Sequence, residues 1–319
     1  MSEIFIASSS IDEPTYGPVV NKLEDRGHDV SVYLADRVST GLDLFSLSFA
    51  SRGETVFTYN HEIINLEDIG AAWYRQPNLI NLGDDDRAKQ LSVEHEIKAL
   101  QDAIWQMIPS KAWLNSPESL DRSEIKLGQL ATAGALGFNV PPTVVSNIWG
   151  PINSELSDDI IVKMSRGVLF EDNQTKMVFT TRLSAQDREA LDEKSPFPGI
   201  FQNYKDKSKE WRITVVGDQI FEVAIYTSEE AKDDWRKHQL TKKVDFKIEK
   251  IDSDIREKCI QFLGEYGLRY GAFDFVEDSE GKITFLECNP CDQYMWLENT
   301  LDLPISDAIV DELIKIAVT

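Results

Sequence analysis

The chain has 319 residues, with 33 Lys and Arg against 55 Asp and Glu, and a formal net charge of −22. This length is sufficient for about two or three domains with hydrophobic cores. The acidic charge argues against nucleic acid or an anionic membrane as partner, because both require a positive surface. No apolar run approaches the roughly 20 residues of a membrane helix, and the first residues lack the pattern of a signal peptide. We therefore expect a cytoplasmic protein.

The N-terminal part of the sequence has the pattern of an α/β unit. Residues 3–8 predict a strand, residues 16–26 predict a helix that ends at Gly27, and residues 29–34 predict a second strand. A strand, a helix and a strand in this order are typical of parallel pairing. Farther along the chain we expect strands over 55–59 and 71–74, a helix over 91–107 and a helix over 118–134.

Short strands dominate the pattern from Asp158 onward. We expect strands over 160–164, 177–180, 200–202, 211–216 and 220–227, a helix over 184–194 and a hairpin turn at Gly217-Asp218. Near the C-terminus we expect a helix over 255–266, strands over 270–276 and 282–287, and an amphipathic helix over 305–316.

Two of these strands carry carboxylates. Asp274 lies inside the apolar run 271–276, Glu287 follows the apolar run 283–286, and Asn289 comes two residues later. Because side chains alternate along a strand, Glu287 and Asn289 share a face if the strand continues, and a hairpin can bring Asp274 beside them. Two carboxylates and an amide oxygen suit Mg²⁺ or Mn²⁺. The alternative is that Asp274 caps a turn and Glu287 is merely exposed.

Three basic side chains are candidates for binding phosphate. Lys163 lies in the apolar run 160–164 and precedes the small loop 165–167, which can aim its charge at phosphate oxygens. Alternatively, it is an edge-strand lysine that reaches solvent. Lys126 is a second, weaker candidate cation. Arg212, inside an apolar strand, is suited to the charge of a phosphate or an acyl-phosphate.

The segment Phe201-Gln202-Asn203-Tyr204 has the character of a linker between two sheets. Its backbone can meet the edge of an adenine, and the nearby Glu210 can hydrogen-bond a ribose. Cys288 and Cys291 have the spacing of redox and zinc sites. The four histidines are scattered and supply no second pair of ligands, so we interpret the two thiols as incidental.

In this order along the chain, these residues resemble the ATP-grasp superfamily. The series is Lys126, Lys163, the 201–204 segment, Glu210-Trp211-Arg212, Asp274 and Glu287-Cys288-Asn289-Pro290. More narrowly, four segments resemble the microviridin-type ligases, the graspetide macrocyclases: Ala72-Trp73-Tyr74-Arg75, Trp211 through Gly217, Asp233-Asp234-Trp235-Arg236 and Trp296-Leu297-Glu298. The resemblance covers nearly the whole chain. In one place the chain departs from the family: Cys291-Asp292 stand where an Asn-Gly pair is common.

The resemblance implies an α/β protein, α+β in its ATP-binding part, with the three-part ATP-grasp fold and ATP held between two sheets. The expected parts are an N-terminal domain over 1–115, a central part over 116–200 and a C-terminal part over 201–319. The implied cofactors are ATP and Mg²⁺. The implied site residues are Lys126, Lys163, Gln202, Asn203, Tyr204 and Glu210 on the nucleotide, Asp274, Glu287 and Asn289 on the metal, and Arg212 and Arg236 in catalysis.

The same resemblance implies a ligase that binds a ribosomally made precursor peptide through its leader. Such enzymes phosphorylate an Asp or Glu side chain of the core peptide, and a Ser, Thr or Lys side chain then attacks to give a lactone or lactam. A homodimer is a possible assembly. Two other interpretations stay open: a ligase that adds an amino acid to a protein or small carboxylate, and an ATP-sensing or peptide-binding protein without catalysis.

Overall fold

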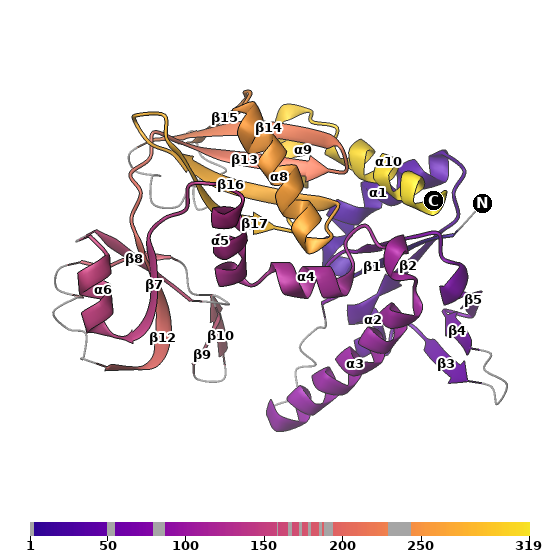
Figure 1. The fold of residues 1–319 in the computed structure, drawn as a ribbon. Coiled ribbons are helices and arrows are strands. Elements are labelled where there is room, and N and C mark those ends of the chain that lie inside the picture. The colour runs from indigo at the N-terminus through magenta and orange to yellow at the C-terminus, as the bar shows by residue number, and fades with distance from the viewer. Residues whose placement is uncertain are drawn as a thin grey trace.

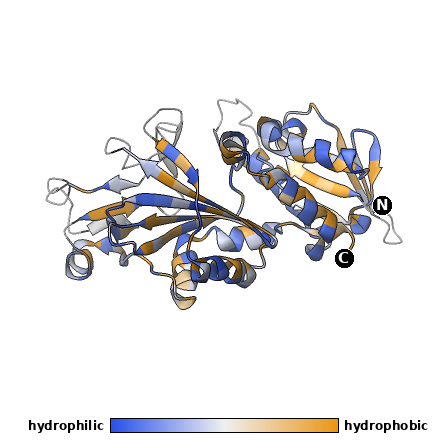
Figure 2. Cartoon of the chain, turned by 90° about the horizontal axis from the view of Figure 1, so that it is seen from above, coloured by the Kyte–Doolittle hydropathy of each residue, from blue (hydrophilic) through white to orange (hydrophobic). Residues whose placement is uncertain are grey.

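The computed structural model of the chain describes residues 3–49, 55–78, 87–157, 159–164, 168–171, 174–177, 180–184, 187, 194–228 and 244–319. Figure 1 shows an N-terminal part and a central part at opposite ends of the molecule, with a large C-terminal sheet joining them. Hydrophobic residues colour much of the strands, while the helices carry both hydrophobic and hydrophilic stripes (Figure 2). This distribution is typical of sheets covered by amphipathic helices.

The N-terminal part contains a parallel sheet, as the sequence predicted. Its central strand β1 (Ile4–Ser8) is buried throughout and pairs with β2 (Val30–Leu34) and β6 (Ala71–Tyr74). Helix α1 (Glu13–Asp25) starts three residues earlier than expected, because a proline fits its first turn. The remaining elements are α2 (Ala35–Ser39), α3 (Arg87–Met107) and an antiparallel sheet of β3 (Phe45–Phe49), β4 (Thr55–Tyr59) and β5 (Glu62–Ile64).

The helix predicted over 118–134 is wrong as a single element. The chain forms α4 (Pro117–Ser123) and α5 (Lys126–Ala135), with Ile125 in an extended conformation between them. The side chain of Gln129 compensates for the break by donating a hydrogen bond to the backbone oxygen of Ser123 over 2.6 Å. The break makes Lys126 the first residue of its helix, next to the C-terminal sheet.

The central part contains the antiparallel sheet β11-β8-β12-β7, here called the central sheet. Its members are β7 (Thr143–Ile148), β8 (Ile160–Lys163), β11 (Thr181–Arg182) and β12 (Lys194–Asn203), with α6 (Trp149–Glu155) and the hairpin of β9 (Val168–Glu171) and β10 (Gln174–Met177). Met177, the first residue of the strand expected over 177–180, ends β10, and residues 178 and 179 lie outside the described residues. Most of the helix expected over 184–194 lies outside the described residues, and Lys194 begins β12.

The C-terminal sheet has the antiparallel order β15-β14-β13-β16-β17. Its strands are β13 (Lys209–Val216), β14 (Gln219–Thr227), β15 (Val244–Ile248), β16 (Tyr270–Glu277) and β17 (Ile283–Asn289). On one face, alternate residues such as Ile213, Phe273 and Phe285 form a core with α8 (Ser253–Tyr266). Helix α8 ends at Gly267, whose φ of 68° favours glycine. The residues between these, such as Arg212 and Asp274, project from the opposite face of the sheet.

The last helix of the chain packs against its N-terminal part. Helices α9 (Met295–Leu301) and α10 (Ile305–Ala317) follow β17, and α10 packs against α1, so that both chain ends lie on the same side of the molecule (Figure 1). Residues of α1, β1, β14 and α10 share one hydrophobic core. No helix within the described ranges combines the length and apolar character needed to cross a membrane.

Candidate active site

Three neighbouring strands of the C-terminal sheet place charged side chains in one row. Arg212 on β13 is paired in register with Asp274 on β16, and Asp274 is paired with Glu287 on β17. Residues directly opposite each other on antiparallel strands project to the same face. Beyond this row the register shifts, since Phe275 pairs with Phe285 and leaves Leu286 as an extra residue. Such bulges are common beside active sites, where they redirect a side chain.

The expected metal ligands lie at the end of this hairpin. Strand β17 includes both Glu287 and Asn289, and the Asn289 amide lies 3.5 Å from a carboxylate oxygen of Asp274. The ammonium of Lys126 lies 2.5 Å from a carboxylate oxygen of Glu287. Gln129, three residues after Lys126, holds the strand through its side-chain amide. The amide oxygen accepts a hydrogen bond from the backbone N–H of Cys288, and the amide nitrogen donates one to the backbone oxygen of Cys288. The structure thus brings Lys126 and the three candidate ligands together.

The charges of this cluster are suited to a divalent cation. Arg212 is only 5% exposed and its Nε lies 3.0 Å from Asp274. The pKa of Asp274 is raised to about 7, mainly by burial and also by the carboxylates of Glu287 and Asp292, against the opposing effect of the Arg212 charge. A divalent cation beside Asp274 would favour the ionised carboxylate that burial disfavours. Two carboxylates and an amide oxygen are hard ligands, so these residues fit Mg²⁺.

The residues expected at the nucleotide lie on the central sheet and its connection to β13. Lys163 ends β8, where it is half-buried, and pairs in register with Ile200 of β12. Gln202 is buried near the end of β12; its amide nitrogen donates to the hydroxyl of Thr143, while its oxygen has no hydrogen-bond partner within the described residues. An unpaired buried oxygen is costly, which is consistent with a ligand on this strand.

Three more nucleotide candidates lie close by in the chain. The Asn203 side-chain oxygen accepts a hydrogen bond from the backbone of Ser157, so it faces the central part. The ring of Tyr204 stacks under the Arg182 guanidinium at 4.1 Å. Glu210 accepts a hydrogen bond from Lys207 over 2.7 Å and precedes Arg212 by two residues, on the same face of β13.

Two sequence features lie outside the described residues. The loop 165–167 after Lys163 is one, and the Asp233–Arg236 segment is the other. The proposed catalytic role of Arg236 therefore rests on the sequence alone.

The sequence assigned no role to two further groups at the site, Asp292 and Arg75. Asp292 lies 3.0 Å from Nη1 of Arg212. Arg75 was noted only within a family motif, yet its guanidinium is buried and donates to the backbone oxygen of Cys291. The sequence signal that could have indicated a role for Asp292 is its position three residues after the candidate metal ligand Asn289. The two thiols lie in different surroundings: Cys288 is in the core against α8, and Cys291 faces Arg75.

Solved structures resemble the chain along its full length. A Chryseobacterium gregarium RiPP-associated ATP-grasp ligase, in complex with ADP and a leader and core peptide, is 29% identical, with a TM-score of 0.86 over 99% of this chain and 97% of that chain. The macrocyclase MdnC from Microcystis aeruginosa, bound with precursor peptide MdnA, is 27% identical, with a TM-score of 0.82 over 98% of this chain and 99% of that chain. The chain is an ATP-grasp ligase that resembles the RiPP-associated ligases and macrocyclases.

This ligase also shares its fold with the ATP-grasp ligase PsnB, at 22% identity and a TM-score of 0.79 over 99% of each chain. The sequence matches no family model and no curated protein. The predicted ATP-grasp fold and the predicted ligase class are confirmed by the solved structures. The roles of individual residues stay predictions.

Proposed function

We propose that this ligase uses ATP to phosphorylate an Asp or Glu side chain of a ribosomally made precursor peptide. A Ser or Thr hydroxyl, or a Lys amine, of the same peptide then attacks the acyl-phosphate and displaces phosphate, which gives an ester or an amide. The products are ADP, phosphate and a peptide that has lost one water for each bond. The similar ligases were solved with ADP and with precursor peptides, which supports this choice of substrates. The need for ATP favours a cytoplasmic location.

The observation that carries the proposal is the row of Arg212, Asp274 and Glu287 across β13, β16 and β17. Asp274, Glu287 and Asn289 would hold Mg²⁺, which when bound supplies positive charge to the phosphates of ATP. Arg212 is buried beside them, so its guanidinium stabilises the negative charge of the acyl-phosphate in a site with little water.

The other residues are assigned to binding. Lys126 and Lys163 contribute positive charge to the nucleotide phosphates, since both lie on elements that border the two sheets. The segment Gln202, Asn203 and Tyr204 contacts the base, and Glu210 the ribose. Arg236 is assigned to the peptide carboxylate from the sequence motif.

Mass spectrometry of a reaction with a candidate precursor tests the function. The purified ligase is incubated with ATP, Mg²⁺ and a precursor peptide that contains leader and core, and each bond formed is expected to remove the mass of one water. A reaction without ATP is the control. A gain in mass equal to an added amino acid would instead support the ligase class that adds amino acids. An unchanged peptide with every precursor encoded beside the enzyme would contradict the proposal.

A further inference from the structure

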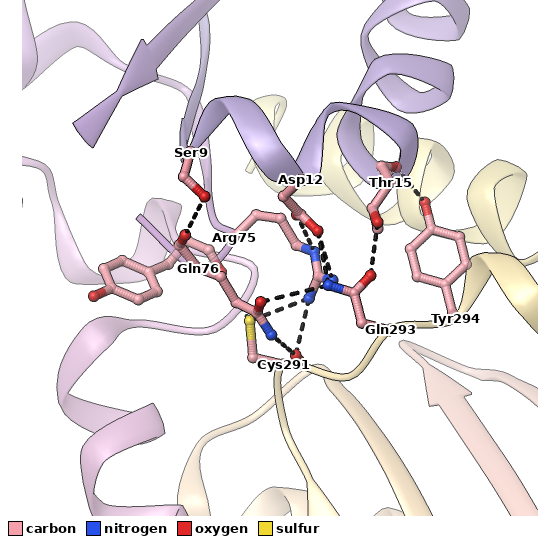
Figure 3. A network of polar contacts seen from close by, with 9 residues as sticks. Ser9, Asp12, Thr15, Arg75, Gln76, Cys291, Gln293 and Tyr294 are labelled. Carbon is pink, nitrogen blue, oxygen red and sulfur yellow. Dashed lines mark hydrogen bonds and ion pairs between the residues drawn. The ribbon is translucent and has the colours of Figure 1, made fainter. Parts of the chain in front are cut away.

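The segment after β17 is held by the N-terminal part of the chain (Figure 3). The backbone oxygen of Cys291 accepts hydrogen bonds from Nη1 of Arg75 and from the side-chain amide of Gln76, each 2.9 Å long. The side chain of Gln293 donates to Asp12 over 2.8 Å and accepts from the hydroxyl of Thr15 over 2.7 Å. Both chain neighbours of Asp292 are therefore fixed from the N-terminal side.

The anchor of this network is a buried ion pair. Arg75 is 1% exposed, and its Nε lies 2.8 Å from Asp12, which is 4% exposed. The backbone N–H of Arg75 also donates a hydrogen bond to the backbone oxygen of Ala7, near the end of the central strand β1. The guanidinium therefore extends from a residue that is tied to the N-terminal sheet. Breaking such a pair leaves an uncompensated charge, so the geometry is strongly held.

Asp292 itself lies against the sheet and contacts Arg212. Its Oδ2 lies 3.0 Å from Nη1 of Arg212, while Asp274 lies 3.0 Å from Nε of the same guanidinium. Asp292 and Asp274 therefore contact different nitrogens of one guanidinium. If Asp274 binds a cation, Asp292 is the carboxylate that still neutralises the buried guanidinium.

We propose that Asp292 is a positioning residue for Arg212, and that the buried Arg75–Asp12 pair holds Asp292 in place. This inference rests on the proposed role of Arg212 at the acyl-phosphate. A guanidinium held by one carboxylate can turn about that contact, whereas two carboxylates at different nitrogens fix its plane. Because a small displacement of a catalytic group lowers the rate strongly, the N-terminal part contributes to the rate of bond formation without touching the reacting atoms.

Kinetics of the Asp292→Asn and Arg75→Lys variants test this inference. We expect Asp292→Asn to lower kcat for peptide dehydration about 10- to 100-fold, with the KM for ATP within about twofold of the wild type. Arg75→Lys keeps the positive charge but loses the fork of donors, so we expect a smaller loss of kcat. If Arg75 acts through Asp292, the double variant is no slower than Asp292→Asn.

The control variant is Asp307→Asn. Asp307 also joins α10 to the N-terminal part, through Lys22 at 2.7 Å, but contacts no residue of the site, so we expect its kcat to be unchanged. A thermal melt checks the folding of each variant, and Asp292→Ser replaces Asp292→Asn if the latter does not melt cooperatively.

Three results would overturn the inference: a wild-type kcat in the Asp292 variant, multiplied losses in the double variant, or a parallel rise in the KM for ATP. A wild-type enzyme that dehydrates no precursor would instead contradict the proposed function.

Discussion

Lys126 and Glu287 form an ion pair of 2.5 Å between the first residue of α5 and the face of β17 that carries the candidate metal ligands. The two residues are far apart in the sequence, and the pair links a candidate phosphate ligand to a candidate metal ligand. The candidate nucleotide site and the candidate metal site are therefore parts of one charged cluster. Changes at one are expected to affect the other.

Replacing Asp274 by Asn is expected to lower turnover about 100-fold or more, because the loss of a metal ligand removes several kcal/mol of charge stabilisation. The side chain keeps its shape, so we expect a cooperative thermal melt. Glu280→Gln, at an exposed position of the same hairpin, is the matched control. Full activity of Asp274→Asn at ordinary Mg²⁺ concentrations would exclude Asp274 as a ligand.

Replacing Lys163 by Met is expected to weaken ATP binding about 10-fold or more, since a charged hydrogen bond is worth roughly 1.5–3 kcal/mol. Isothermal titration calorimetry with ATP measures the dissociation constant. Lys98→Met, at an exposed position of α3, is the control for loss of one positive charge. An unchanged dissociation constant for Lys163→Met would remove Lys163 from the nucleotide site.

Replacing Gln129 by Ala is expected to lower the free energy of unfolding by about 3 kcal/mol, because the buried N–H and C=O of Cys288 both lose their partner. Urea unfolding measures the change. Gln106→Ala, exposed on α3, is expected to have little effect. If both variants unfold at the same urea concentration as the wild type, Gln129 does not support β17.

Replacing Arg236 by Lys is expected to leave ATP binding intact and to abolish dehydration of the precursor. A lysine ammonium cannot form the two parallel hydrogen bonds that a guanidinium donates to a carboxylate. ATP titration and mass spectrometry on the same preparation separate the two effects. Arg122→Lys, at an exposed position of α4, is the control. Cyclisation by Arg236→Lys at the wild-type rate would show that the peptide carboxylate is held elsewhere.

Local patterns in the sequence determined the strands and most of the helices. The apolar runs around Arg212, Asp274 and Glu287 predicted strands, and a hairpin was expected to bring Asp274 beside Glu287. The structure pairs Asp274 with Glu287 in register, and also with Arg212. The run from Ile255 to Tyr266 with Gly267 predicted α8. These features depend on residues close in the chain, so their pattern is visible without the fold.

The tertiary structure alone decided how the separate segments meet. The break of the predicted helix at Ile125, the contact of Lys126 with Glu287, and the contact of Arg75 with the segment after β17 follow from how α5 and the N-terminal sheet pack against the C-terminal sheet. The residue types at these positions are compatible with many partners. Burial decides among them, because a buried charge requires an opposite charge or a hydrogen bond within reach, and only the folded chain determines which one lies there.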